Sequence, residues 1–305
     1  MSRIDEALRR AGTPASERAR HGTAVPDVFV SPWNTDHPVE HHHQSVKPLE
    51  ATVVPFIERE TPTIRPRPLR PSPFDSFRPG WKERLVVSPE SNPGLVDQFR
   101  RLAAMLLHAQ RTTGLKSVMV TSAEPDDGKT LTALNLALVL SESYRRRVLL
   151  VEGDLRRPAI LAAAGLSAAE GLSESIRAGE DHKVPLVTFT ETLTLLPAGS
   201  PDPDPLSGLT STRMQRLLKD AAEQFDWVIV DTPPLGAAAD ASLLCPMVDG
   251  AILVIRAGRT ECDSVQRAIE TLGRDRILGV VLNGVAGGKD DSYHTDYSDR
   301  MAVKG

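Results

Sequence analysis

The fold of this chain is decided by the stretch Val118-Met-Val-Thr-Ser-Ala-Glu-Pro-Asp-Asp-Gly-Lys-Thr130. It begins as a short apolar run, continues as a loop and ends in Gly-Lys-Thr, and an apolar helical pattern starts directly after it. This order of strand, loop and helix is the context that a phosphate-binding loop of the pattern G-x-x-x-x-G-K-[ST] requires. The stretch therefore predicts a nucleotide-binding loop, although Ala123 stands where the pattern has its first glycine.

The residue types at the end of this loop suit phosphate chemistry. Backbone N–H groups at the start of a helix point at phosphate oxygens, and Gly128 lets the backbone come close because it has no Cβ. We expect Lys129 to place its charge on the β- and γ-phosphates of a nucleotide, and the hydroxyl of Thr130 to take one position around Mg²⁺.

Composition sets bounds on the class of protein. The 305 residues are enough for one or two domains with a core of ordinary size. Acidic residues number 40 against 36 Lys and Arg, and the net charge of −4 gives no indication of nucleic-acid binding. Cys245 and Cys262 are interpreted as thiols of a reducing compartment. No apolar run approaches the roughly 20 residues of a membrane span and no secretory signal is evident, so we expect a cytoplasmic protein.

Four segments differ in composition. Residues 1–12 place apolar side chains on one helical face and predict a short amphipathic helix, which is either a docking element for a partner or a frayed terminus. Residues 13–80 alternate proline with arginine and lack apolar periodicity, which is typical of a disordered linker. The nucleotide-binding domain is predicted over 81–288, and residues 289–305 are expected to form a flexible, tyrosine-containing tail.

Within 81–288, continuous apolar runs alternate with helical patterns. Such runs predict the buried strands of a mostly parallel, doubly wound α/β sheet with helices on both faces. Helices are predicted from Asn92 to about Thr112 and over 263–272. Besides the run before the loop, the predicted strands lie at 85–87, 148–151, 193–196, 225–231, 250–256 and 277–283.

Polar side chains stand at or just past the ends of these strands. Glu152 and Asp154 follow one strand, Asp231 ends another, and Arg256 and Asn283 end two more. Ligands of such sheets bind beyond the carboxyl ends of the strands, so these residues are expected to converge with the loop on a single nucleotide site.

Each carboxylate has an expected role there. Asp231 is the natural ligand on the Mg²⁺ side, directly or through water, because Mg²⁺ uses one or two carboxylates together with phosphate oxygens. Glu152 and Asp154 are expected to face the γ-phosphate, where one of them could accept a proton from an attacking hydroxyl or water. Arg156 and Arg157 either stabilise phosphate charge or pair with surface acids, and the sequence leaves both interpretations open.

The sequence resembles a known family over about residues 85–300. The residues that carry the resemblance are Asp231-Thr-Pro-Pro234 with Asp240-Ala, the run from Val248 to Gly258, and Asp154-Leu-Arg-Arg-Pro158. With the phosphate loop, they resemble the Walker A, A′ and B motifs of the bacterial tyrosine kinases (BY-kinases), the CpsD/CapB-type autokinases of polysaccharide biosynthesis. The resemblance implies a P-loop fold related to the MinD/ParA ATPases, use of ATP with Mg²⁺, and tyrosine autophosphorylation that regulates capsular or exopolysaccharide synthesis and export.

The resemblance also implies a set of site residues. Lys129, Asp154, Glu152 and Asp231 match catalytic positions, and Thr130, Asp231 and Asp154 match positions around the metal. The implied nucleotide contacts are Glu124, Asp126, Asp127, Gly128, Lys129, Thr130, Leu131, Arg256 and Asn283, the last two near the base. Tyr293 and Tyr297 are the implied phosphate acceptors, whereas Tyr144 is expected to pack or cap.

Three departures from the family pattern stand out. The first of the two aspartates of the A′ motif is Glu152 here. Asp126 stands where the loop has glycine, and Asp127 follows it, so two carboxylates should weaken triphosphate binding unless they turn outward or meet Mg²⁺. The ring-forming motif Glu-x-x-Arg-x-x-Arg is reduced to Asp97 and Arg100, with Ala103 in place of the second arginine, which puts ring assembly of the self-associating protein in question.

The resemblance further implies a partner: a membrane chain-length-determining (Wzz-like) protein, or its cytoplasmic tail, which would hold this protein at the inner face of the membrane. Two rival functions remain open at this point. One is an ATPase switch of the MinD/ParA kind, which places a lysine where Glu124 stands here. The other is a catalytically slow ATP-binding regulator of a polysaccharide export complex.

Overall fold

The computed structural model describes residues 74, 76–88, 91–168, 170–178, 184–237 and 239–285. The predicted segment 1–12, nearly all of 13–80 and the tail with Tyr293 and Tyr297 lie outside these residues. The predicted domain boundaries therefore stay predictions, apart from the point where folded structure begins. Phe74 and Phe77, which we placed in the linker, are 9% and 4% exposed in the core, so the fold begins before residue 81.

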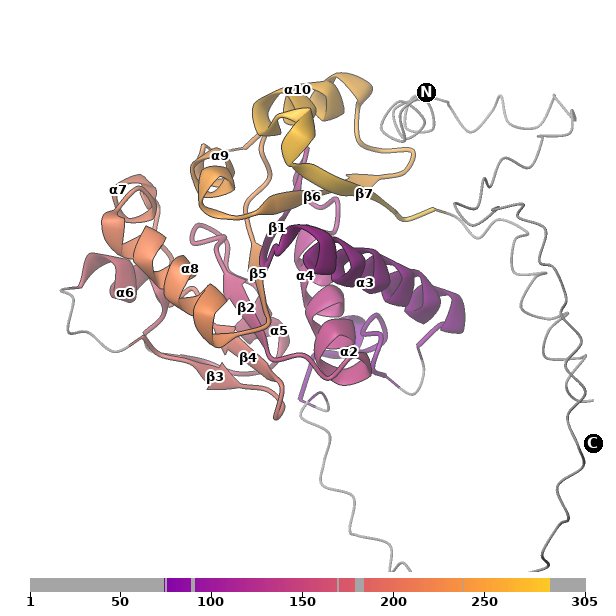
Figure 1. Cartoon of the computed structure of the whole chain (residues 1–305), viewed down its shortest axis with the longest axis horizontal. Helices are drawn as coiled ribbons and strands as arrows, with labels where there is room; N and C mark the ends of the chain where they lie inside the picture. The colour runs from indigo at the N-terminus through magenta and orange to yellow at the C-terminus, as the bar shows by residue number, and fades with distance from the viewer. Residues whose placement is uncertain are drawn as a thin grey trace, which may run out of the picture. The chain divides into compact units, whose positions relative to one another are not determined.

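A seven-stranded sheet forms the centre of the described part, in the order β3-β4-β2-β5-β1-β6-β7. Neighbouring strands are parallel except for β3 and β4, which confirms the predicted mostly parallel α/β fold. The strands are β1 (Ser117–Ser122), β2 (Val148–Glu152), β3 (Val187–Thr188), β4 (Leu193–Leu196), β5 (Trp227–Asp231), β6 (Gly250–Arg256) and β7 (Ile277–Asn283). The two-residue β3 was not predicted, because it is too short to show a pattern (Figure 1).

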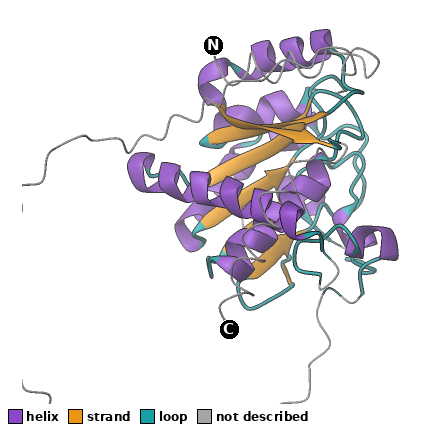
Figure 2. Ribbon diagram, turned by 90° about the vertical axis from the view of Figure 1, so that its right-hand side faces the viewer, coloured by secondary structure: helices purple, strands orange, loops and turns teal. Residues whose placement is uncertain are grey.

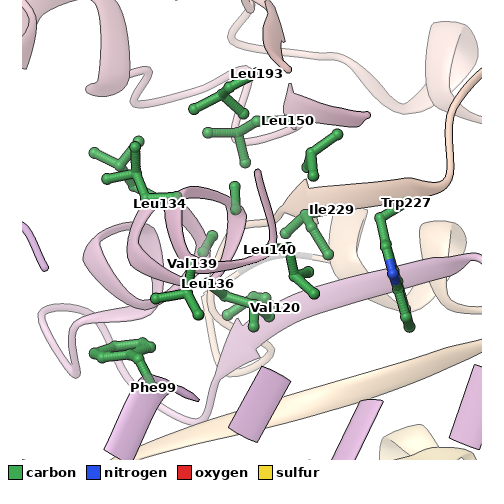
Figure 3. Close-up of a cluster of buried hydrophobic side chains, with 14 of the residues drawn as sticks. Phe99, Val120, Leu134, Leu136, Val139, Leu140, Leu150, Leu193, Trp227 and Ile229 are labelled. Carbon is green, nitrogen blue, oxygen red and sulfur yellow. The ribbon is translucent and has the colours of Figure 1, made fainter. Parts of the chain in front are cut away.

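Helices lie on both sides of this sheet (Figure 2). Alternate residues of the strands belong to two separate clusters, as the twofold periodicity of a strand requires. One cluster packs against α3, α4 and α5 and includes Val120, Leu150 and Ile229 (Figure 3); the other packs against α6, α8, α9 and α10. The helical segments are α2 (Pro79–Lys82), α3 (Pro93–Thr113), α4 (Lys129–Leu138), the π-helical η1 (Val139–Ser143), α5 (Ile160–Ala163), α6 (Leu172–Arg177), α7 (Leu206–Leu209), α8 (Thr212–Gln224), α9 (Asp240–Leu244), η2 (Cys245–Met247), α10 (Cys262–Leu272) and η3 (Arg274–Arg276).

The predicted helix after Asn92 is confirmed, and its ends have local causes. The Asn92 side chain accepts hydrogen bonds from the N–H groups of Gly94 and Leu95, and Pro93 occupies the first helical position, where a missing N–H costs nothing. Gly114 ends α3 with a φ of 77°, a left-handed conformation that glycine adopts without steric strain.

None of the helices in the described part combines the length and the apolar character that a membrane span requires.

The strand predicted at 85–87 is wrong. Leu85 and Val86 are buried, but they lie in consecutive turns and pair with no strand. The buried side chain of Asn135, on α4, bonds this segment instead: its Oδ1 accepts from Val86 N at 3.0 Å, and its Nδ2 donates to Arg84 O at 2.9 Å. An apolar run alone predicts burial and does not distinguish a strand from a packed turn.

Candidate nucleotide-binding site

The predicted site residues gather at one edge of the sheet. β1 lies between β5 and β6, and β2 lies on the far side of β5, so the loop after β1 faces the ends of both acidic strands. Glu152 and Asp231 occupy matched positions on β2 and β5. The predicted convergence of loop and acidic strand ends on one site is therefore present in the structure.

Lys129, the first residue of α4, forms an ion pair at the centre of the site. Its Nζ lies 3.0 Å from Asp154 Oδ2, and the two side chains are only 14% and 6% exposed. Burial lowers the pKa of Lys129, but the charges of Asp231 and Asp154 outweigh burial and raise that pKa above its ordinary value. Lys129 therefore stays charged, with Asp154 in the position of a counter-ion that a phosphate oxygen could replace.

Asp231 provides a carboxylate next to the hydroxyl of Thr130. The residue is 1% exposed, and its Oδ1 has no hydrogen-bond partner among the described residues. Burial raises the pKa of Asp231 to about 7, while the charge of Lys129 and a hydrogen bond with the Thr130 side chain act in the opposite direction. An unpartnered buried carboxylate oxygen is costly, and a cation beside it would remove that cost.

The donor set fits Mg²⁺ that is held jointly with phosphates. The described residues contain no group of three or more His, Cys, Asp or Glu side chains that could hold a metal alone. Thr130 and Asp231 offer hard oxygen atoms at the end of the phosphate loop. Mg²⁺ typically takes one or two protein oxygens and completes its shell with phosphate oxygens and water.

Glu152 does not take the position that we expected. Its Oε1 accepts the N–H groups of Ala159 and Ile160, each at 2.6 Å, and its Oε2 accepts Ala198 N at 3.2 Å. Three backbone donors thus hold this 1%-exposed carboxylate at the start of α5. Asp154 contacts Lys129, whereas Glu152 uses its longer side chain to fasten the turn that follows β2.

The two loop carboxylates both contact residues of the turn that follows β6. Asp126 is exposed, with a φ of 64°, and its carboxylate lies 3.9 Å from Arg259. Asp127 is buried: its Oδ2 accepts Glu124 N at 3.0 Å, and its Oδ1 accepts the hydroxyl of Thr260 at 2.7 Å. Burial raises the pKa of Asp127, although the bond from Thr260 counteracts it. These contacts with Arg259 and Thr260 lessen the expected conflict between the two acids and a triphosphate.

Arg256 and Asn283 contact the loop itself. The Arg256 guanidinium donates to Asp126 O at 3.0 Å, and Asn283 Nδ2 donates to Asp127 O at 2.7 Å. A Cβ on Gly128 would lie 2.1 Å from Asn283 Nδ2 and would displace that side chain, and the φ of 100° at Gly128 also favours glycine. The sequence placed both residues near the base; here they hold loop carbonyls.

Thr260 is a site residue that sequence reasoning missed. It is 2% exposed and lies four residues after Arg256, in the turn between β6 and α10. A single threonine in a turn carries no distinguishing sequence signal, and its partner, Asp127, is 133 residues away.

Leu131, which was expected to contact the nucleotide, lies in the first turn of α4 and packs against the core.

The structure settles the open interpretation of Arg156. Its Nε donates to Asp240 Oδ2 at 2.7 Å and its Nη2 to Asp240 Oδ1 at 3.2 Å, and the Asp240 side chain is 1% exposed. Arg156 therefore pairs with an acid. For Arg157, the backbone N–H donates to Asp154 Oδ1 at 3.1 Å, which orients the carboxylate that faces Lys129.

The residues of the reduced ring-forming motif lie on α3, and Tyr144 directly follows η1. Asp97 and Arg100 are 3.5 Å apart, and Ala103 is fully buried in the core. Tyr144 packs against the same core and its hydroxyl donates to Arg100 O at 3.2 Å, which supports the expected packing role.

Comparisons with known proteins agree with this geometry. No family model matches the chain. Tyrosine-protein kinase YwqD of Bacillus subtilis (strain 168) is 35% identical over 204 residues, which are 66% of this chain and 84% of the relative. The chain belongs to the family of bacterial tyrosine-protein kinases.

Two further relatives show how the match extends. The kinase domain of Escherichia coli tyrosine kinase ETK is 31% identical and superposes with a TM-score of 0.59 over 64% of this tyrosine kinase and 78% of that domain. The succinoglycan biosynthesis transport protein ExoP of Rhizobium meliloti (strain 1021) is 32% identical over 209 residues, which are 66% of this chain and 26% of that relative. The resemblance inferred from the sequence motifs is confirmed.

Proposed function

We propose that this protein is an ATP-dependent tyrosine autokinase that regulates the synthesis and export of a capsular or extracellular polysaccharide. The observation that carries the proposal is the position of Lys129 and Thr130, at the end of the phosphate loop, beside the buried carboxylates of Asp154 and Asp231. Membership of the tyrosine-kinase family supports the reaction, and the name of the succinoglycan transport relative supports the pathway.

The proposed mechanism begins with the Lys129–Asp154 ion pair. Phosphate oxygens of ATP compete with Asp154 for the Lys129 ammonium group, and charge-assisted contacts of this kind are the strong ones. When Lys129 turns to the phosphates, Asp154 Oδ2 loses the hydrogen bond from Lys129 Nζ. That oxygen is then free to accept a proton beside the phosphates. The Lys129 contact then serves both to bind the nucleotide and to free the base.

Asp154 is the proposed general base for phosphoryl transfer. The tyrosine hydroxyl has an ordinary pKa near 10, so it needs an acceptor for its proton as its oxygen bonds to the γ-phosphorus. The bond between that phosphorus and the leaving ADP oxygen breaks as the new bond forms, and the proton goes to Asp154. Mg²⁺ held beside Thr130 and Asp231 would supply positive charge that stabilises the phosphates. Glu152, our second choice as base, is better assigned to holding the turn after β2.

Tyr293 and Tyr297 are the proposed acceptors, supplied by a neighbouring copy of the chain. They lie four residues apart in a polar stretch that also holds Asp290, Asp291 and Asp296. Each phosphate would add about −1.5 to −2 charges. The modified tail should then leave an acidic site by repulsion, which gives an on–off cycle.

The partner is proposed to be a membrane chain-length-determining protein that brings the kinase to the inner face of the membrane. The support is the name of the succinoglycan biosynthesis transport relative. This chain matches only 26% of that relative, so most of the relative lies outside the match. The two loop aspartates, Asp126 and Asp127, give the proposal no support, because both carboxylates are held by the turn that follows β6. Addition of the cytoplasmic tail of such a protein should raise ATP turnover; turnover that is equally fast without it contradicts the partner proposal.

One experiment separates the kinase from its rivals. Purified protein is incubated with Mg·ATP, with and without that partner tail, and then analysed by mass spectrometry and a phosphate-release assay. Phosphotyrosine supports the kinase. Released phosphate without phosphotyrosine favours an ATPase switch, and neither product favours a slow regulator.

The nucleotide contact itself is tested with Lys129→Met. The change removes a charge-assisted phosphate contact worth roughly 1.5–3 kcal/mol, so Mg·ADP affinity should fall about 10- to 150-fold by calorimetry. Lys219→Met, on the exposed side of α8, is the matched control and should bind as wild type does. Equal affinity of wild type and Lys129→Met contradicts the assignment of the site.

A further inference from the structure

A continuous chain of hydrogen bonds runs from the end of β6 into the phosphate loop. Arg256 N donates to the Thr260 hydroxyl oxygen at 2.9 Å, and that hydroxyl lies 2.7 Å from Asp127 Oδ1. A backbone N–H can only donate, so the Thr260 proton is left for Asp127. Asp127 Oδ2 in turn accepts Glu124 N at 3.0 Å. Thr260 and Asp127 are 2% and 1% exposed, so water does not compete for these bonds.

Two more contacts from the same side hold the loop carbonyls. Arg256 Nη1 donates to Asp126 O at 3.0 Å and Asn283 Nδ2 to Asp127 O at 2.7 Å. We call Asp127, Arg256, Thr260 and Asn283 the loop clamp. It joins the loop after β1 to the ends of β6 and β7, the next two strands of the sheet (Figure 1).

The clamp fixes where the loop N–H groups point. A trans peptide is planar, with its C=O and N–H on opposite sides. Because Arg256 and Asn283 hold the carbonyls of Asp126 and Asp127, the N–H groups of Asp127 and Gly128 point away from β6 and β7. Within the described part of the chain, the N–H groups of residues 128–131 donate to no other group. Free N–H groups at a helix start are what a phosphate requires.

The clamp also holds an unfavourable backbone conformation. Asp126 has a φ of 64°, which is strained for a residue with a Cβ. Such a conformation persists when its surroundings determine it, and here the contact from Arg256 to Asp126 O and the burial of Asp127 do so.

We infer that Thr260 and Asp127 are positioning residues for nucleotide binding: their side chains set the direction of the loop N–H groups without touching the nucleotide themselves. This deepens the proposed function and rests on it. The Asp127 carboxylate thus positions the loop, and only the backbone N–H of Asp127 is left as a nucleotide contact. Thr260 gains a role that no motif indicated.

The test is Thr260→Val, which removes the hydroxyl at nearly constant volume and leaves Arg256 N and Asp127 Oδ1 without their partner. Calorimetry with Mg·ADP should show an affinity loss of about tenfold or more, since the lost bond is made to a carboxylate. Thr260→Ser keeps the hydroxyl and should bind within about threefold of wild type. Thr271→Val is the matched control, because Thr271 lies on the exposed side of α10 and its hydroxyl donates to Arg267 O, within that helix.

A second measurement needs no nucleotide. In the nucleotide-free protein, the Gly128 amide should show microsecond-to-millisecond exchange broadening by NMR in Thr260→Val and not in wild type, Thr260→Ser or Thr271→Val. Asp127→Asn provides an independent variant if Thr260→Val does not fold, because an amide cannot accept both bonds that the carboxylate accepts. The double variant should cost little more affinity than either single variant, since the two residues act through one bond.

The outcomes separate the inference from the proposal on which it rests. If wild type binds Mg·ADP, and Thr260→Val and Asp127→Asn bind it equally well with an unchanged Gly128 signal, the clamp inference is wrong and the proposed function stands. If wild type does not bind Mg·ADP, the proposed function falls and the clamp inference falls with it.

Discussion

Replacement of Asp231 by asparagine should stabilise the nucleotide-free protein. The carboxylate is 1% exposed, and its Oδ1 has no partner in the described part of the chain. Burial raises the pKa of Asp231 to about 7, even though the charge of Lys129 works against this. Asparagine has nearly the same shape and no charge, so Asp231→Asn should remove the cost of a buried anion.

The size of the effect follows from the pKa difference. An exposed aspartate has a pKa near 3.8 and Asp231 one of about 7, which is about three pH units at about 1.4 kcal/mol each. Between about pH 4 and 7, the folded protein keeps a proton that the unfolded chain has released, so wild-type stability falls as pH rises through this window and levels off above it. The stability gain of Asp231→Asn should therefore be about 2 kcal/mol at pH 5 and approach about 4 kcal/mol above pH 7.

The assay is urea unfolding of nucleotide-free protein in EDTA at pH 5, 6, 7 and 8. Asp220→Asn, on the exposed side of α8, is the matched control and should change stability by less than about 0.5 kcal/mol at every pH. In calorimetry, Asp231→Asn should lose Mg²⁺-dependent ADP binding despite its higher stability. The buried charge of Asp231 destabilises the fold but is needed to bind the cation. A stability difference that stays constant from pH 5 to 8 refutes the reasoning.

Three further predictions concern structural charges and backbone strain. Burial raises the pKa of Asp249, but hydrogen bonds from the N–H groups of Lys116 and Ser117 outweigh burial and lower that pKa below its ordinary value. Asp249→Asn should therefore cost about 1 kcal/mol at pH 7 in urea unfolding, and the loss should shrink as pH falls below about 4. Arg156→Lys replaces a two-bond contact with the buried Asp240 by a single one and should cost roughly 1–2 kcal/mol in the same assay; an unchanged midpoint contradicts this. Asp126→Gly should relieve a φ of 64° and raise stability by up to about 1 kcal/mol in thermal unfolding, whereas Asp126→Ala should not.

The sheet and the gathering of the site could be predicted because both are encoded locally. Continuous apolar runs set the strands of the parallel sheet, and the order of strand, loop and helix around Gly128 set the phosphate loop. Polar residues at the ends of parallel strands must meet at one edge, which brought Asp154 and Asp231 to Lys129 without knowledge of any side-chain position.

Side-chain directions could not be predicted in this way. The orientation of Asp127 depends on Thr260, 133 residues away, and that of Glu152 depends partly on Ala198, 46 residues away. The sequence around a carboxylate in a phosphate loop does not distinguish a side chain that faces the phosphate from one that faces another part of the protein. The turn at Leu85 was misassigned for the same reason, because its bonding partner Asn135 belongs to a later helix.

The central claim is that the Lys129 site transfers phosphate to the tail tyrosines of another copy. The most direct test mixes Lys129→Met, which keeps its tyrosines, with Tyr293→Phe/Tyr297→Phe, which keeps its site, in Mg·ATP under conditions in which wild type labels itself. Mass spectrometry should find phosphate on Tyr293 or Tyr297 of the Lys129→Met copy, and only in the mixture. If neither tyrosine of that copy carries phosphate, the claim is contradicted.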